Sequence, residues 1–270
     1  MTDRLEVAKQ RTTGVLAAPR LAVGFLTRIP VGDVGEVDDA RLRDATGWFP
    51  LVGAVVGLVE GGIRWGLDAA LGDMVAAVLA VMGAVLVTGA FHEDGLADAC
   101  DGLFGGWTPQ RRIEIMRDSR LGTYGTVGLA GALLVRVGVL ATLPADRAVA
   151  VAVTAHVVSR AMILVQIRSL PAASNQGSGA KVADPVRGAH LVVAALSATA
   201  ALAWWQAGAI VALGGAVLGV VVMWALARRL LDGLTGDILG ATQQLALLGT
   251  QLGLLAVVRA GADASGRGLG

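Results

Sequence analysis

Charged residues are scarce in this sequence of 270 residues: Asp, Glu, Lys and Arg make up only 16%, whereas 55% of residues are apolar. Such a composition excludes an intrinsically disordered chain and is unusual for a water-soluble domain. The formal net charge is only +1, so the basic excess that accompanies a nucleic-acid partner is missing. Cysteine is nearly absent as well. The single Cys100 excludes an intramolecular disulfide, and no set of Cys and His residues has zinc spacing.

Long apolar runs dominate instead. About 20 mostly apolar residues in a helix cross the hydrocarbon core of a bilayer, and a helix satisfies its own backbone hydrogen bonds there. Residues 74–91 carry no charge, and the stretch 189–227, also without Asp, Glu, Lys or Arg, is too long for one span. We interpret the latter as a hairpin that turns near 204–206, where two tryptophans suit a membrane interface. We therefore expect an all-α fold, a polytopic membrane bundle of about seven transmembrane helices, with further spans near 48–67, 123–143, 148–167 and 238–258.

The basic residues predict the direction of these helices. Sixteen of the 22 Lys and Arg residues would lie on the side of the N-terminus, four on the other side and two within spans. The excess of positive charge on cytoplasmic loops therefore favours an N-in, C-out arrangement. We expect residues 14–29 to form an interfacial helix, because Arg20 and Arg28 interrupt a run that is too short to span.

This arrangement predicts a single membrane-embedded domain over residues 1–260, followed by a disordered Gly-rich tail at 261–270. Every long charged loop falls on the cytoplasmic face, so we expect the chemistry there. The expected active-site loops are 92–122, 168–188 and 228–237.

Three acids follow the second predicted span. At about 100° per residue, Asp94, Asp98 and Asp101 project within roughly 60° of one another on a helix. Like charges so placed destabilise a helix unless something offsets the repulsion. A hard divalent cation does so, and Mg²⁺ takes one or two carboxylates together with phosphate oxygens. The plainer alternative is a solvated acidic face at a membrane exit.

Basic residues follow these acids. Arg117 and Arg120 are three apart and suit phosphate oxygens. Asp118, between them, would complete a metal shell or act as a base. Arg111 and Arg112 are better explained as positive-inside anchors.

Two more loops belong to the same predicted face. Asp237 and Thr235 stand at the mouth of the last span, where Asp237 is either a further metal ligand or a helix N-cap. The polar segment 174–181 is a candidate lid over phosphates, although Lys181 is more simply a solvated loop residue.

Ionisable residues also occur inside predicted spans, where they are costly and usually face a polar cavity. Arg160 is a site candidate for this reason. His156 is explained by a hydrogen bond to a neighbouring helix, and Glu60 and Arg136 either pair with structural partners or extend towards water. These groups are scattered along the sequence.

The acid-rich segments strongly resemble the cobalamin synthase family, the adenosylcobinamide-GDP ribazoletransferases. The resemblance is carried by HEDGLADACDGLFGG at 92–106 and RIEIMRDSRLGTYG at 112–125, with FLTRIP at 25–30, WFPLVG at 48–53 and TGDILGA at 235–241. One departure is Gln244, where the family often has Glu, so the resemblance implies no acidic role at this position.

The resemblance implies an inner-membrane transferase that completes the nucleotide loop of coenzyme B12. It would join adenosylcobinamide-GDP to α-ribazole or its 5′-phosphate, release GMP and require Mg²⁺. Positioning and charge neutralisation are what phosphoryl transfer asks of a protein. The expected catalytic residues are Asp94, Asp98, Asp101 and Asp118, and the expected metal ligands are Asp94, Asp98, Asp101 and Asp237. The substrates would contact His92, Arg117, Ser119, Arg120, Thr123, Arg160 and Thr235.

Two other readings stay open from sequence. A CDP-alcohol phosphotransferase of lipid synthesis also sets aspartates on a helix at a membrane face, but its Asp-Gly-x-x-Ala-Arg pattern is not matched at Asp94–Asp98. A transporter or metal channel would account for the intramembrane ionisable residues, but no pair of discontinuous helices marks a midplane site. Gly- and Ala-rich spans permit close helix contacts within one chain or between two, so a homo-oligomer is also open.

Overall fold

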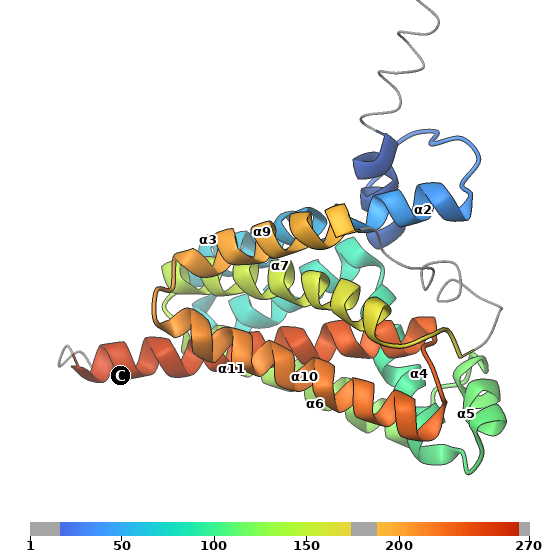
Figure 1. The fold of residues 1–270 in the computed structure, drawn as a ribbon. Helices are drawn as coiled ribbons and strands as arrows, with labels where there is room; N and C mark the ends of the chain where they lie inside the picture. The colour runs from blue at the N-terminus through green and yellow to red at the C-terminus, as the bar shows by residue number, and fades with distance from the viewer. Residues whose placement is uncertain (1–16, 174–187, 265–270) are drawn as a thin grey trace, which may run out of the picture.

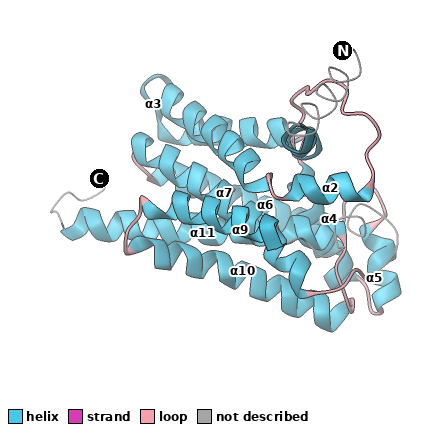
Figure 2. Ribbon diagram, turned by 45° about the horizontal axis from the view of Figure 1, so that its top comes forward, coloured by secondary structure: helices cyan, strands magenta, loops and turns pink. Residues whose placement is uncertain are grey.

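The computed structural model describes residues 17–173 and 188–264, and these residues fold almost entirely into helices (Figures 1 and 2). Among them there is no strand, only an isolated bridge between Ala172 and Leu234. A short apolar helix, Ala17–Leu26, comes first. The helices that follow are α2 (Asp39–Thr46), α3 (Phe49–Thr88), α4 (Phe91–Gly105), α5 (Pro109–Met116), α6 (Thr123–Thr142), α7 (Ala145–Ser169), α9 (Gly188–Ala203), α10 (Gly208–Leu230) and α11 (Gly236–Ala264).

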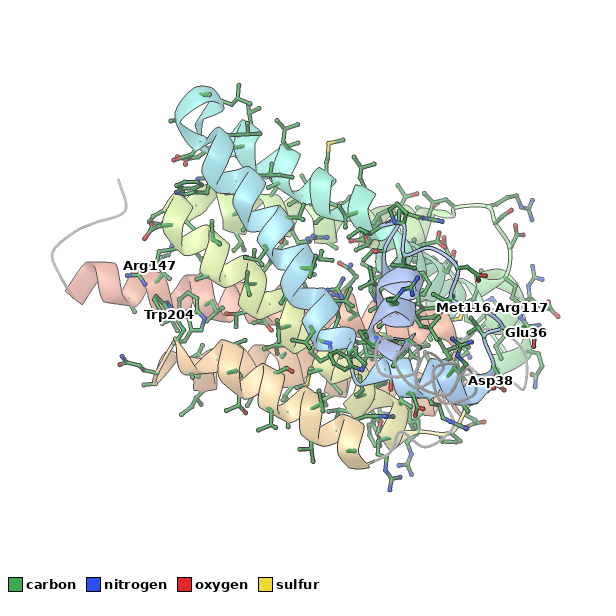
Figure 3. The ribbon with its side chains drawn as sticks, turned by 90° about the horizontal axis from the view of Figure 1, so that it is seen from above. Glu36, Asp38, Met116, Arg117, Arg147 and Trp204 are labelled. Atoms are coloured by element: carbon green, nitrogen blue, oxygen red, sulfur yellow. The ribbon has the colours of Figure 1, made fainter. Side chains whose placement is uncertain are left out.

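The long helices lie side by side in an elongated bundle with two different ends. One end carries α2, α4, α5 and the α10–α11 connection, and we call it the loop end (Figure 1). The other, the hairpin end, carries the turn within α3, the short α6–α7 and α9–α10 turns and the end of α11. Figure 3 shows Arg117 and Asp38 at the loop end and Arg147 and Trp204 at the hairpin end. All described parts of the three expected active-site loops therefore lie at one end.

The expected polytopic membrane bundle is confirmed. Five helices are long and apolar enough to cross a membrane: α3, α6, α7, α10 and α11. Helix α3, with 40 residues, turns back on itself at Gly72, whose φ of 74° lies in the left-handed region, and so supplies two of the expected spans. The 189–227 stretch forms the expected hairpin, but α9 has only 16 residues and is shorter than a full span.

The two ends of the described chain refine the expectations. A helix lies at Ala17–Leu26, within the segment 14–29 that was expected to be an interfacial helix, and its residues Leu21, Ala22 and Leu26 are buried in the core. Helix α11 continues to Ala264, past the start of the expected tail at Gly261, and residues 265–270 lie outside the described residues.

A stripe of glycines lets α3 pack directly against the backbone of α7. Gly53, Gly57 and Gly61 are four residues apart and share one face of α3. A Cβ at Gly57 would stand 2.6 Å from the Cα of Val153, and one at Gly61 would stand 2.5 Å from the Cα of Val149. Such small-residue stripes allow helix backbones to approach closely inside a membrane, where apolar burial gives no net drive to associate. The contact also holds Glu60 against α7.

At the hairpin end, Arg64 ties the turn of α3 to the end of α6. Its side chain is fully buried and donates to the backbone carbonyls of Leu140 at 3.0 Å and Leu143 at 3.3 Å. It also pairs with Asp68 and Asp73 on either side of the α3 turn. Arg64 therefore has a structural role at the hairpin end.

The glycine stripe makes a testable prediction. Gly61→Ala forces a methyl group into the α7 backbone, and overpacking of this kind costs about 1–3 kcal/mol. A Cβ at the neighbouring Gly62 would meet nothing within 4 Å. We therefore expect Gly61→Ala to lower the thermal unfolding midpoint of the purified protein in detergent, whereas Gly62→Ala leaves it unchanged or raises it slightly. Equal effects of the two substitutions would contradict the packing described.

Candidate active site

Helices α4 and α11 cross with their backbones in contact at the loop end. A Cβ on Gly95 would lie 3.2 Å from the Cα of Gly240 and 3.3 Å from the Cα of Asp237, and a Cβ on Gly240 would lie 3.1 Å from the Cα of Gly95. This close approach brings the acids of α4 beside the first turn of α11. Carboxylates that are 136 or more residues apart in sequence therefore face one region of the molecule.

The acids converge on Asp98. Burial together with the charges of Asp94, Asp237 and Asp101 raises the pKa of Asp98 to about 7. Asp94 is exposed, while Asp98 and Asp237 are half-buried, so this region opens to the loop end. Acids of α4 and α11 therefore lie close enough for their charges to interact. Their mutual repulsion leaves a local excess of negative charge that a cation would relieve.

Asp101 is already committed to the backbone of α6. Its Oδ2 accepts from the Gly122 N–H at 2.7 Å and its Oδ1 accepts from the Gly125 N–H at 2.8 Å. The carboxylate therefore caps the N-terminus of α6, where it satisfies unpaired donors and meets the positive end of the helix dipole. Both positions require glycine, because a Cβ there would lie 2.4 Å and 2.3 Å from this carboxylate. Asp101 is only 8% exposed.

Two basic residues of the α5–α6 region, Arg117 and Arg120, interact with different acids. Arg117 is exposed and lies close enough to Asp237 for their charges to interact. Arg120 forks onto Asp118, with NH2 to Oδ2 at 2.6 Å and Nε to Oδ1 at 3.0 Å. This pair holds the pKa of Asp118 at about 2, which makes that carboxylate a poor base near neutral pH. Because the pair is exposed, a phosphate could compete for Arg120 at little cost.

Arg111 and Arg112, expected to be anchors, have separate roles. Arg111 pairs with Glu114 at the surface, at 2.9 Å. Arg112 donates to the carbonyl oxygens of Leu103 at 3.2 Å and Leu230 at 3.1 Å, and so ties α5 to α4 and α10. Arg112 therefore supports the shape of the loop end.

The hydroxyl candidates differ in their surroundings. Ser119 and Thr123 are exposed before and at the start of α6, with side chains accessible to a ligand. The Thr235 hydroxyl accepts from the Ile238 N–H at 3.2 Å, so it caps α11. The neighbouring chain is fixed by backbone hydrogen bonds between Leu234 and the segment 171–173, which brings two of the expected loops together.

Two residues that were predicted to contact the substrates, His92 and Arg160, are buried deeper in the bundle than the acids. His92 is 2% exposed, and its Nε2 has no hydrogen-bond partner. Burial, with the positive charges of Arg160 and Arg136 nearby, holds the pKa of His92 well below its usual range, so the ring is neutral. Arg160 is 1% exposed and donates to His156. Neither side chain reaches the surface on which the acids are exposed.

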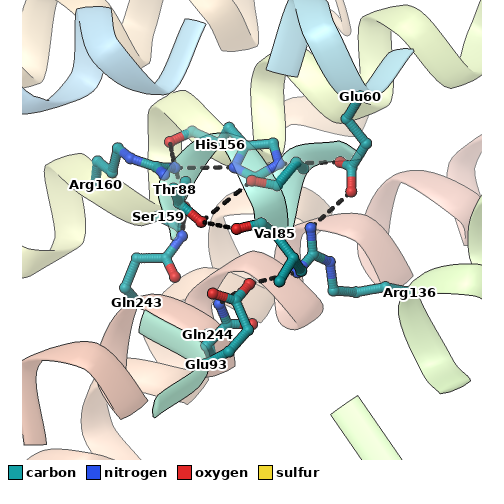
Figure 4. A network of polar contacts seen from close by, with 11 residues as sticks. Glu60, Val85, Thr88, Glu93, Arg136, His156, Ser159, Arg160, Gln243 and Gln244 are labelled. Atoms are coloured by element: carbon teal, nitrogen blue, oxygen red, sulfur yellow. Dashed lines mark hydrogen bonds and ion pairs between the residues drawn. The ribbon is translucent and has the colours of Figure 1, made fainter. Parts of the chain in front are cut away.

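A buried polar network beneath the acids is the main feature that sequence reasoning missed (Figure 4). Arg136 binds Glu60 at 2.6 Å and Glu93 at 2.8 Å, and Glu60 contacts His156 at 2.9 Å. The ionisable residues of the spans are therefore connected rather than scattered, and Glu60 and Arg136 are structural partners. Three further side chains join them from α7 and α11: Arg160, Gln243 and Gln244.

The described residues contain no preformed cluster of three or more His, Cys, Asp or Glu side chains in metal-binding geometry. The described acids therefore do not form a closed structural metal site. Mg²⁺ differs from such sites because it takes one or two carboxylates and completes its shell with waters and phosphate oxygens. The unbalanced acids around Asp98 fit that mode of binding. The segment 174–181, a candidate lid, lies outside the described residues.

The two roles of the acids can be separated experimentally. Asp101→Asn replaces an acceptor oxygen by an amide that faces a backbone N–H, so we expect a loss of about 1–3 kcal/mol of folding free energy. Asp94→Asn removes an exposed charge from an acidic cluster and should leave the thermal unfolding midpoint unchanged or raise it. Thermal unfolding in detergent measures both variants. If Asp101→Asn were as stable as the wild type, the capping role would be refuted.

Comparison with known proteins identifies the family. Residues 18–255 match the family model described as cobalamin-5-phosphate synthase. A relative from Azorhizobium caulinodans, named adenosylcobinamide-GDP ribazoletransferase, is 40% identical over 263 residues, covering 92% of this chain and 99% of its own. A relative of the same name from Polaromonas sp. is 40% identical and covers 87% of this chain and 94% of its own.

A third relative of that name, from Ralstonia pickettii, is 37% identical over 87% of this chain and 93% of its own length. No solved structure matches the chain significantly. The matched family is the one that the acid-rich motifs resemble, rather than the CDP-alcohol phosphotransferases or a transporter. An all-helical membrane bundle with its acids gathered at one end, together with a match over most of its length, shows that this chain belongs to the cobalamin-5-phosphate synthase family of transferases.

Proposed function

We propose that this enzyme transfers the adenosylcobinamide phosphate group from adenosylcobinamide-GDP to α-ribazole or its 5′-phosphate and releases GMP. The relatives named for this activity support the proposal, since they align over most of their own length. The observation that carries it is the convergence of Asp94, Asp98 and Asp237 at the loop end. A group of acids with arginines beside it suits a metal-bound diphosphate.

We propose that Mg²⁺ is held by Asp94 and Asp98 of α4 and by Asp237 of α11, with the diphosphate completing its shell. Bound there, it would neutralise the charge on the phosphate oxygens. Asp101 is left out of this set, although it was expected in it, because its two oxygens already accept backbone hydrogen bonds. Its part is to hold the N-terminus of α6 beside α4.

The remaining steps belong to residues of the loop end. In the proposed reaction the ribazole hydroxyl oxygen forms a bond to the cobinamide-linked phosphorus, and the bond from that phosphorus to the GMP oxygen breaks. One of the acids of the loop end accepts the hydroxyl proton, and the pKa of about 2 makes Asp118 a poor base for this step at neutral pH. Arg117 and Arg120 are exposed, and Arg117 lies close enough to Asp237 for their charges to interact; these two arginines stabilise the diphosphate and the departing GMP.

The location proposed for this reaction is the cytoplasmic face of the bacterial inner membrane. In the described part of the chain, most of the Lys and Arg residues belong to segments at the loop end (Figure 1), and cytoplasmic loops carry such an excess. The loop end would then face the cytoplasm, and the C-terminus of α11, at the hairpin end, would lie outside.

The proposed activity is tested by mass spectrometry of the products. Purified protein in detergent, given adenosylcobinamide-GDP, α-ribazole and Mg²⁺, should release GMP and form the joined corrinoid, and excess EDTA should stop the reaction. Asp94→Asn, Asp98→Asn and Asp237→Asn should each slow GMP release by roughly a hundredfold or more, because several kcal/mol of charge stabilisation is lost. Near-wild-type rates in all three variants would refute the metal set. No GMP release by the wild type would refute the activity.

The raised pKa of Asp98 predicts a pH dependence. The carboxylate is ionised above about pH 7 and becomes protonated as the pH falls through that value. Protons and Mg²⁺ then compete for the same oxygens, so kcat/KM should fall on the acid side of neutrality, and the midpoint should move to lower pH as Mg²⁺ is raised. The measurement is a pH profile at two Mg²⁺ concentrations. A profile that is flat between about pH 5 and 8, or one that ignores Mg²⁺, would contradict the assignment.

A further inference from the structure

We propose that Glu93, Gln244 and Arg136 are positioning residues, which fix α4 on α11 and thereby set the distance between the acids of the active site. The functional readout of this inference rests on the proposed transfer reaction. The residues themselves lie beneath the site, in the buried network. None of them belongs to the metal set proposed above.

One carboxylate oxygen joins three helices. The Oε1 atom of Glu93, in the first turn of α4, accepts from Arg136 NH1 of α6 at 2.8 Å and from Gln244 Nε2 of α11 at 3.0 Å. Arg136 is in turn held by Glu60 of α3 at 2.6 Å. All four side chains are buried (Figure 4). Glu93 immediately precedes Asp94, so whatever fixes Glu93 also fixes the acid next to it.

The contact between α4 and α11 needs an interaction that fixes the register of the two helices. At Gly95 and Gly240 the two backbones touch without side chains between them. Helices that pack through side chains are held in register by ridges that enter grooves, and a contact between glycines offers no ridges. Hydrogen bonds are directional, so the bond between Glu93 and Gln244 can fix the register that the glycines leave free. An error of one ångström in the placement of reacting groups can cost about a hundredfold in rate.

The charges of the network are balanced. Glu60 and Glu93 supply two negative charges, and Arg136 and Arg160 supply two positive charges. A buried ion group of this kind is seldom more stable than an apolar core of the same volume, although loss of one member is costly. Burial of four charged groups therefore calls for a reason other than stability. Precise placement of the helix that carries Asp94 and Asp98 supplies that reason.

Because Glu93 and Gln244 are joined by a hydrogen bond, exchanging the carboxylate and the amide between these two positions tests the proposal. Glu93→Gln leaves an excess positive charge in the network, and Gln244→Glu sets a second carboxylate against Glu93. The double variant puts the carboxylate on α11 and the amide on α4, which restores both the charge balance and a donor facing an acceptor. We expect each single variant to lower kcat at saturating substrate by about a hundredfold and the double variant to recover most of that loss.

The measurement distinguishes positioning from simple loss of folding. GMP release is measured per folded protein at a temperature well below the unfolding midpoint of each variant, and the midpoints are measured separately. A positioning role predicts that kcat falls in folded single variants and returns in the double variant. If the single variants lose only thermal stability and keep a wild-type kcat, the residues merely stabilise the fold and the proposal is overturned.

Gln251 provides a matched control. It lies seven residues after Gln244 on α11, is fully buried, and its side-chain atoms have no hydrogen-bond partner in the described structure. Gln251→Glu adds the same charge to the same helix about two turns away. We expect it not to rescue Glu93→Gln. Equal rescue by Gln251→Glu, or a double variant at 93 and 244 no better than the product of its single variants, would overturn the proposal.

Failure of the proposed function gives a different result. If the wild type releases no GMP, the transfer reaction is wrong, whatever the variants do. The coupling between positions 93 and 244 is then read from thermal unfolding alone, as a double-variant cycle. Additive effects on the midpoint in that cycle would refute the bond between Glu93 and Gln244 on which the positioning role depends.

Discussion

The approach of α4 to α11 at Gly95 and Gly240 is the constraint on which the rest of the site depends. Acids on α4 alone would be a stripe on one helix, and Asp237 alone would be an acid in the first turn of another. The glycines remove the side chains that would hold the two backbones apart, and the acids then meet near Asp98. The raised pKa of Asp98 is the electrostatic consequence of this meeting.

The residues around this crossing have different roles at the surface and in the interior of the bundle. At the surface, exposed acids and arginines face water, where a charged substrate arrives. Below them, Asp101 caps α6, and Glu93 joins Arg136 to Gln244. The bundle beneath is packed through glycine stripes, which gain van der Waals contact without apolar burial. A helical bundle with a buried polar network thus lies beneath an open, polar site.

Much of the fold could be predicted from the sequence, because hydrophobic runs in a membrane permit few structures. The 189–227 hairpin and the gathering of the charged loops at one end followed from run length and from the positions of Lys and Arg. The acids were found for a similar reason, since Asp94 and Asp98 stand one helical turn apart. The resemblance of the motifs then identified the family, which the match over residues 18–255 shows.

The missed features depend on contacts between distant segments. Nothing local distinguishes Asp101 from Asp98, and only the Gly122–Gly125 pair, seen beside Asp101 in the fold, reveals a cap. The sequence spacing of Glu60, Glu93 and Arg136 likewise says nothing about their meeting. The signal that was available is the cost of an ionisable residue inside a span, which implies that each one has a partner.

The most direct test of the account is the position of the metal in an experimental structure. The protein would be crystallised with Mn²⁺, which takes the same oxygen ligands as Mg²⁺, and with adenosylcobinamide-GDP, and the metal located by its anomalous scattering. The account predicts a peak at the loop end between α4 and α11, within coordination distance of carboxylates of Asp94, Asp98 or Asp237 and of the diphosphate. A diphosphate-bound metal elsewhere, without a ligand from either helix, would contradict it.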